Sequence, residues 1–218
     1  MELVDFLEFP ANLVLVDPRI DCSVHTDPVP RKASEKDEYQ RSDSMAEITL
    51  PPVEPIRSLA LTLKEALITE DKKAVRVACA KMLVVLAQFY GVEPPDIKIL
   101  NARPLKTSEK WIVETFGDYS PDTARIRLWM RTAVQKKATS YGVMLNTLVH
   151  EFFHHLDMVS LNLPETFHTR GFYERVALLY HHIQDTPVKK IVWRSQSDGT
   201  YHVDWGKTMS RASASKSE

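Results

Sequence analysis

Residues 147–157 read Thr147-Leu148-Val149-His150-Glu151-Phe152-Phe153-His154-His155-Leu156-Asp157. The apolar residues in and around this segment recur at steps of three and four, which predicts an amphipathic helix from about residue 142 to residue 157. His150 and His154 are four residues apart, so a helix would point both side chains the same way, where they can share one metal ion. Glu151 lies beside them and can deprotonate a metal-bound water molecule.

Zinc suits this pattern, because a catalytic zinc ion takes three protein ligands, often histidines, and keeps one position for water. We expect one zinc ion per chain, with His168 as the third ligand, because His168 lies at the entrance to the next predicted helix, residues 172–183. Asp157 is the main alternative, since it lies seven residues after His150 on the same face and could bind the metal or orient a histidine. Glu165 is a weaker alternative.

The remaining pattern predicts an α+β chain with helices near the N-terminus and a small, mostly antiparallel sheet. One predicted strand alternates apolar with basic residues, which indicates a sheet with one buried face. Between two of the strands, the turn-rich residues 117–122 predict a linker. The other predicted elements are helices near residues 56–67 and 70–90, strands at 97–100, 111–116 and 124–130, and a hairpin over 190–205 that turns at Asp198-Gly199.

The N-terminal quarter of the chain differs from the rest in charge and in pattern. Residues 1–55 carry a net charge of −7, while the other residues carry +6. Residues 17–55 are rich in Pro, Ser and charged side chains without an apolar period, so we expect residues 1–55 to be an acidic, largely disordered arm. The expected domain then covers residues 56–186, and residues 187–218 form a hairpin and a basic Ser/Lys tail.

Composition excludes several classes of protein. With 218 residues, 44% of them hydrophobic, the chain can bury a core, and a net charge of −1 excludes a polycation built for nucleic acid. The longest apolar run, Met82–Ala87, is far shorter than the roughly 20 residues that span a bilayer. The acidic start is unlike a secretory signal, and two cysteines make no disulfide framework. We therefore expect a cytoplasmic protein without a membrane partner.

Residues 117–175 resemble the SprT-like (Spartan-type) zinc metalloprotease domain. The residues that carry the resemblance are Gly117-Asp118-Tyr119, Ile126-Arg127-Leu128, His150-Glu151-x-x-His154 and His168-Thr169-Arg170-Gly171-Phe172. The resemblance implies a minimal zincin-like fold, zinc held by His150, His154 and His168, and Glu151 as general base. The chain departs from the family in two places, because its glycine stands three residues after His168 and its C-terminal hairpin has no cysteines for a zinc ribbon.

The predicted activity is a zinc-dependent metallopeptidase that hydrolyses peptide bonds with a zinc-activated water molecule and Glu151 as base. A protein or peptide substrate would pair in extended form along the strand at residues 126–130, expected to be a sheet edge. One alternative is a zinc hydrolase that acts on a non-peptide substrate.

A further alternative is a DNA-associated SprT-like module with protease activity on DNA-bound proteins. Basic side chains in two parts of the sequence could contact phosphates, although neither set forms a dense run. These residues are Arg125, Arg127, Arg131, Lys136, Lys137, Lys189, Lys190, Arg194, Lys207, Arg211 and Lys216.

Overall fold

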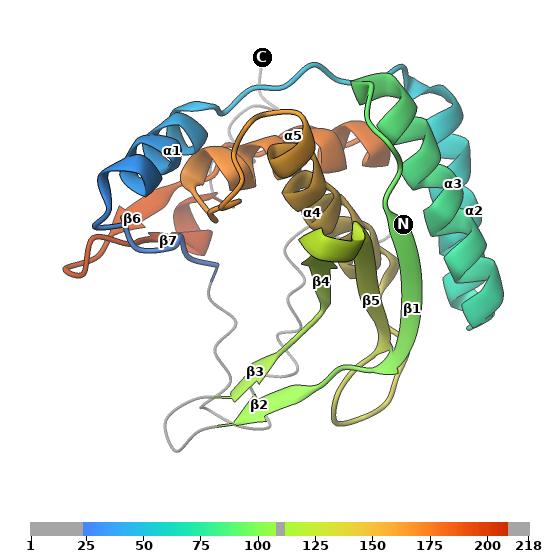
Figure 1. Ribbon diagram of the computed structural model, residues 1–218. Helices are drawn as coiled ribbons and strands as arrows, with labels where there is room; N and C mark the ends of the chain where they lie inside the picture. Colours follow the sequence, from blue (N-terminus) through green and yellow to red (C-terminus); the bar gives the residue numbers. More distant parts are fainter. Residues whose placement is uncertain (1–23, 108–111, 209–218) are drawn as a thin grey trace, which may run out of the picture. The chain divides into compact units, whose positions relative to one another are not determined.

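The computed structural model describes residues 24–107 and 112–208 and shows an α+β protein (Figure 1). The chain divides into two compact units that interleave in the sequence. Among the described residues, one unit consists of residues 51–107 and 112–156, and the other consists of residues 24–50 and 157–208. Among the helices of the described ranges, none combines the length and apolarity that a membrane span requires.

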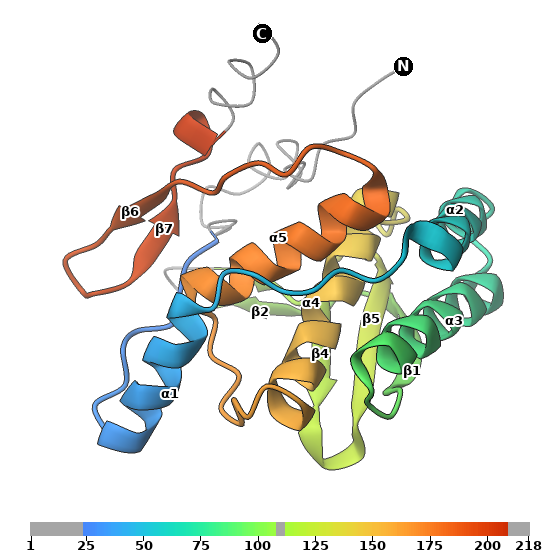
Figure 2. The same ribbon diagram turned by 90° about the horizontal axis from the view of Figure 1, so that it is seen from above.

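Two helices open the described part of the first unit and lie side by side in Figures 1 and 2. They are α2 (Val53–Ile68) and α3 (Lys72–Tyr90). Asp71 caps α3, since its side chain accepts hydrogen bonds from the amides of Lys73 and Ala74, and α3 ends at Gly91 in the left-handed conformation. Both helices confirm the predictions that we made from the apolar spacing in the sequence.

A three-stranded sheet in the order β1-β5-β4 follows these helices. Ile126, Leu128 and Met130 on β5 are buried, while Arg125 and Arg127 are exposed, which confirms the predicted one-sided sheet. The strands of this unit are β1 (Asp96–Ala102), β4 (Gly117–Ser120) and β5 (Arg125–Arg131), with the separate antiparallel pair β2 (Leu105–Thr107) and β3 (Ile112–Glu114).

The sheet corrects three of the sequence predictions. Residues 117–120 form strand β4, where we expected a turn-rich linker. β5 is the central strand, because β1 pairs with one side of it and β4 with the other, so it is not the predicted edge. The sheet is also mixed, since β1 runs parallel to β5 and β4 runs antiparallel to it. The short 3-10 turn η1 (Pro121–Thr123) connects β4 to β5. Trp111, expected in the strand at 111–116, lies outside the described residues.

Helix α4 (Tyr141–Val159) confirms the helix predicted from the histidine segment. Its apolar stripe is fully buried and explains why the segment is helical in this protein. The stripe consists of Leu145, Leu148, Val149, Phe152, Phe153 and Leu156. The division between the two units falls within this helix, after Leu156.

In its described residues the second unit contains two long helices, a hairpin and a short helical segment at residues 205–208, and residues 24–26 run along the hairpin. The amide of Val203 donates to the carbonyl of Val24, and the amide of Thr26 donates to the carbonyl of Tyr201. The hairpin turns at Asp198-Gly199, as predicted, and Gly199 has a φ of +85°. The elements are α1 (Ala33–Ser44), α5 (Arg170–Gln184), β6 (Trp193–Ser195) and β7 (Tyr201–Val203).

Helix α1 is a correction, because we expected no ordered element between residues 17 and 55. Polar contacts hold it rather than an apolar stripe. Glu38 accepts a hydrogen bond from the amide of Glu165, the hydroxyls of Ser42 and Thr169 lie 2.9 Å apart, and Asp43 forms an ion pair with Arg170. Such contacts leave no apolar period in the sequence, so a disorder prediction from composition misses them. Residues 1–23 of the predicted arm lie outside the described residues.

Candidate metal centre

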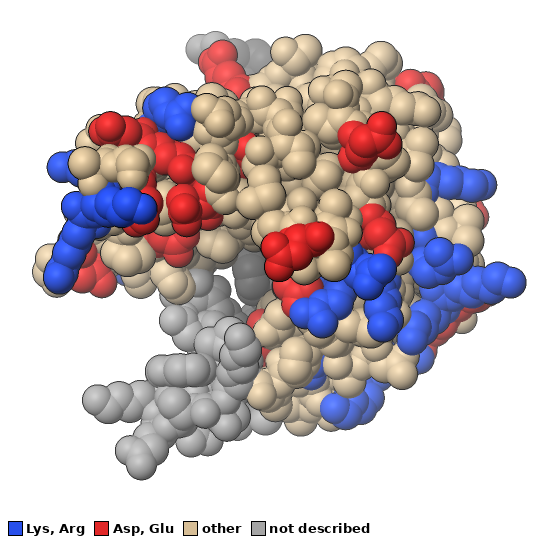
Figure 3. Space-filling view, in the orientation of Figure 1, with Lys and Arg blue, Asp and Glu red and all other residues tan. Residues whose placement is uncertain are grey.

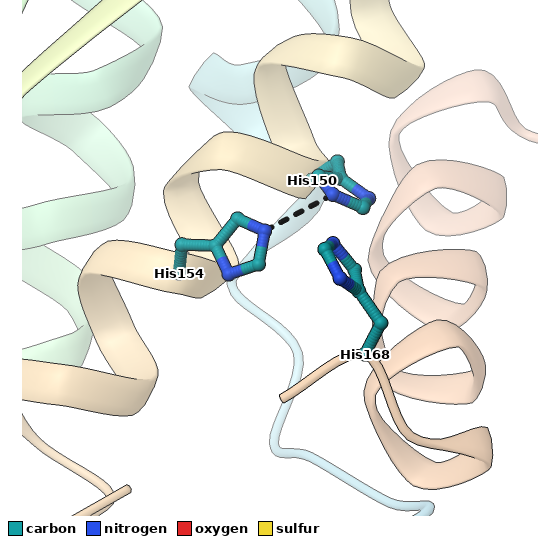
Figure 4. Close-up of side chains that lie close together, drawn as sticks. All are labelled: His150, His154 and His168. Atoms are coloured by element: carbon teal, nitrogen blue, oxygen red, sulfur yellow. Dashed lines mark hydrogen bonds between the residues drawn. The ribbon is translucent and has the colours of Figure 1, made fainter. Parts of the chain in front are cut away.

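His150 and His154 point the same way from successive turns of α4. Their Nε2 atoms lie 3.1 Å apart (Figure 4). Two nitrogens bound to one tetrahedral zinc ion at ordinary bond lengths would lie about 3.3 Å apart. The spacing of these two imidazoles therefore fits two ligands of a single zinc ion.

His168, from the loop before α5, completes the group. The ligand atoms of His150, His154 and His168 all lie within 4.8 Å of one another, and Figure 4 shows the His168 ring pointing toward the other two. Three imidazoles are the donor set of one class of catalytic zinc site, in which water takes the fourth position. The donors thus fit zinc in number and in chemical type.

Glu151 is buried next to the first histidine, with 5% of its surface exposed. Burial raises the pKa of its carboxyl group to about 8, and the negative charge of Asp118 contributes to the increase. In the metal-free protein the carboxyl group is therefore mostly protonated at neutral pH. A bound cation would favour the charged form, which is the form that can accept a proton.

Gly117, at the start of β4, leaves the space that Glu151 occupies. A Cβ atom at this position would lie 2.9 Å from Oε1 of Glu151 and 2.6 Å from Cγ2 of Thr147. Both distances are shorter than van der Waals contact, so any side chain here would displace its neighbours. The backbone of β4 can approach α4 closely only because residue 117 is glycine.

His155 is buried and hydrogen-bonded through both ring nitrogens. Its Nε2 atom lies 2.9 Å from the carbonyl oxygen of Glu93, and its Nδ1 atom lies 2.9 Å from the hydroxyl of Tyr119. A carbonyl oxygen only accepts, so Nε2 donates and Nδ1 accepts from Tyr119. Burial lowers the pKa of His155, which favours this neutral form. His155 thus fixes α4 against β4, a role that spacing along one helix does not reveal.

The two alternative ligands have other partners. Asp157 is fully buried, and both of its carboxylate oxygens accept hydrogen bonds from Nη2 of Arg175, at 2.9 and 3.0 Å. Burial raises the pKa of Asp157 to about 6, although the charge of Arg175 opposes this change. Glu165 is exposed, and its backbone amide donates a hydrogen bond to the carboxylate of Glu38. Neither belongs to the group of described residues placed to hold an ion.

The backbone of His168 is fixed by Asp27, which lies just before α1. The amide of His168 donates to Oδ2 of Asp27 at 2.8 Å, and the amide of Asp27 donates to the carbonyl of His168 at 2.8 Å. The His168 ring also stacks on the ring of Tyr173, with centroids 5.8 Å apart. The hydroxyl of Tyr173 donates to the carbonyl of His25. Residues that are far away in the sequence therefore hold the third histidine in place.

Gly171 explains why the glycine stands three residues after His168. A Cβ atom here would lie 2.2 Å from the carbonyl oxygen of Ser42, 2.7 Å from that of Met45 and 2.9 Å from that of Asp43. These carbonyls belong to the end of α1 and the residue after it, and they meet the first turn of α5. The glycine therefore accommodates α1, an element that the sequence pattern did not predict.

Three of the basic residues considered for DNA binding lie on strand β5, and each forms an ion pair with an acidic side chain. Arg125 forms an ion pair with Asp96 at 2.7 Å, Arg127 with Asp118 at 2.5 Å, and Arg131 with Glu70. On the face in Figure 3, red side chains lie among the blue ones. Partnered guanidinium groups have less charge to offer a phosphate backbone. Arg211 and Lys216 lie outside the described residues.

Of the residues singled out in the sequence, the three histidines lie close together, Glu151 follows the first of them on α4, and Asp157 and Glu165 have separate roles. Sequence reasoning missed Asp27, Tyr119 and the structural role of His155. No protein-family model, curated protein or solved structure matches the chain. Residue chemistry and local geometry therefore carry what we propose for the site.

Proposed function

We propose that this protein is a zinc-dependent metallopeptidase of SprT-like type. The observation that supports the proposal best is the pair of Nε2 atoms of His150 and His154, 3.1 Å apart, beside the buried Glu151. His168 adds a third imidazole within 4.8 Å. Three neutral nitrogen donors and an adjacent carboxylate are what a hydrolytic zinc site requires.

When bound, zinc would supply Lewis acidity that polarises the scissile carbonyl and acidifies a water molecule. Glu151 would accept the proton of the attacking water at a carboxylate oxygen and deliver it to the leaving amine. A general base works best when its pKa lies near the working pH, and the buried position of Glu151 moves its pKa in that direction. Gly117 on the neighbouring strand β4 leaves the space that the carboxylate occupies.

Strand β4 offers the edge along which a peptide substrate would bind. In the described sheet it is the last strand, paired with β5 on one side only, and it begins at Gly117 next to Glu151. An extended peptide that paired with the open side of β4 would bring its backbone past the carboxylate. This edge replaces the central strand β5 that we had expected from the sequence.

The test is hydrolysis of casein by the zinc-loaded full chain and by a Glu151→Gln variant. We expect the variant to keep its zinc ion and to lose activity by about 10²- to 10⁴-fold, the usual contribution of a general base. Glu165→Gln is the matched control, because it changes an exposed glutamate on the loop before α5, and its activity should stay at the wild-type level.

Unchanged casein hydrolysis by Glu151→Gln would overturn the proposal. A parallel screen with small esters and phosphate esters separates a peptidase from the non-peptide zinc hydrolase considered above. Hydrolysis of the esters without cleavage of casein or of any peptide would move the proposal to that alternative.

A further inference from the structure

We propose that Asp27 is a positioning residue for the metal centre, whose carboxylate orients the imidazole of His168 so that Nε2 is the nitrogen presented to the metal. This inference deepens the proposed function and depends on it. It also gives a role in the site to a segment that the sequence assigns to a disordered arm.

The geometry places the Asp27 carboxylate on the correct side of the imidazole. Its Oδ2 atom lies 3.4 Å from Nδ1 of His168, and the same oxygen accepts the His168 amide at 2.8 Å. A carboxylate beside Nδ1 favours a proton on that nitrogen and leaves the Nε2 lone pair available. Metal-binding histidines commonly have such a carboxylate, which fixes the tautomer and the direction of the ring.

Asp27 can act in this way because its own backbone is held from three directions. The preceding residue, Thr26, exchanges two hydrogen bonds with Tyr201 of β7, one through its amide and one through its hydroxyl. The carbonyl of Asp27 accepts the hydroxyl of Tyr39 on α1 at 3.0 Å. Its amide bonds the carbonyl of His168. The carboxylate therefore starts from a fixed backbone rather than from a loose arm.

The exposure of the pair limits the size of the effect. The side chains of Asp27 and His168 are 41% and 33% exposed, so water screens their electrostatic interaction. Loss of a residue that orients a metal ligand commonly lowers metal affinity about 10- to 100-fold. We expect a decrease near the lower end of that range, about tenfold.

Two substitutions separate orientation of the imidazole from simple support of the backbone. Asp27→Asn keeps an oxygen that can accept the His168 amide but removes the negative charge beside Nδ1. Asp27→Ala removes both. If Asp27 only supported the backbone, Asp27→Asn would behave like the wild type. If it orients the ring, Asp27→Asn already weakens metal binding.

The experiment is a zinc titration of the full-length chain against a chromophoric chelator, with wild type, Asp27→Asn, Asp27→Ala, His168→Ala and Asp37→Asn. Asp37 is an exposed carboxylate on α1, so Asp37→Asn controls for the loss of one negative charge. Melting of each metal-free protein checks the fold, and the visible spectrum of the cobalt-loaded protein reports the coordination of the metal. We expect about tenfold weaker zinc binding and a changed cobalt spectrum for Asp27→Asn, with unchanged melting.

The outcomes distinguish this inference from the proposed function. If Asp27→Asn binds zinc within threefold of the wild type while His168→Ala loses affinity, the role of Asp27 is overturned and the metallopeptidase proposal stands. If His168→Ala binds zinc as well as the wild type, His168 is no ligand and the inference fails with it. If the wild type binds no zinc, both proposals fail.

Discussion

The two parts of the candidate site are held in different ways. His150, Glu151 and His154 belong to one helix, and their relative placement follows from helical spacing and a buried apolar stripe. His168 belongs to a loop, and its placement depends on Asp27, more than a hundred residues away in the sequence. The comparison shows that one part of a candidate metal site can be encoded locally while the other depends on polar contacts between distant segments.

The largest expected effect comes from Arg175→Met on α5, the helix that follows the His168 loop. This substitution changes none of the three histidines. Arg175 and Asp157 are both fully buried, and the substitution leaves the Asp157 carboxylate without its partner. An uncompensated buried charge costs about 3–5 kcal/mol, so the free energy of unfolding in urea should fall by that amount. The double variant Asp157→Leu with Arg175→Met should recover most of the loss. A decrease below about 1 kcal/mol in the single variant would contradict the structure.

A smaller effect is expected from Gly117→Ala, which disturbs the helical part. The added methyl group would displace Thr147 and Glu151, and such overpacking costs about 1–3 kcal/mol. Peptide hydrolysis should fall while zinc affinity stays, because the histidines are unchanged. Gly206→Ala is the matched control, because the nearest atom to a Cβ there is an oxygen of Asp204 at an ordinary 3.6 Å. Equal behaviour of the two variants would refute the steric role of Gly117.

Next in size is a pH effect in the metal-free protein. The folded-state pKa of Glu151 is raised to about 8 from 4.5, so its contribution to stability is complete below pH 4.5 and is lost as the pH rises toward 8. Glu151→Gln removes this loss. At pH 8 the metal-free variant should therefore melt above the wild type, by about 2–4 °C for each 1 kcal/mol that ionisation of the buried carboxyl group costs the wild type. The difference should shrink at pH 5, and a constant difference between pH 5 and pH 8 would show that Glu151 has an ordinary pKa.

The smallest effect is expected from Tyr119→Phe. The variant removes the hydroxyl that donates to Nδ1 of the buried His155 and leaves that nitrogen without this partner. The loss of one such hydrogen bond costs about 0.5–1.5 kcal/mol in urea unfolding. Zinc affinity should change little, because the metal ligands lie on a different side of α4. A loss of zinc binding comparable to that of His154→Ala would contradict this expectation and show that the contact between Tyr119 and His155 supports the candidate site.

The sequence predicted what depends on short-range pattern. Helices α2 to α5, the one-sided strand β5 and the hairpin all follow from apolar spacing or turn residues, and so do the two histidines of α4. It did not predict α1, where two of the three buried residues, Glu38 and Ser42, are polar, or strand β4, whose residues read as a turn. Asp27 left no signal either, because a single carboxylate carries no period. Contacts of this kind become visible only when distant segments are placed together.

The pairing of Val24 and Thr26 with β7 has a consequence for synthesis of the chain on the ribosome. The segment before Asp27 is made well before its hydrogen-bonding partners, Tyr201 and Val203, since Thr26 and Tyr201 are 175 residues apart. His150 and His154 leave the ribosome about fifty residues before those partners do. A nascent chain therefore holds the helical histidines well before the backbone that anchors Asp27 is complete. The third histidine acquires its full set of neighbours only after residues 201–203 have been made.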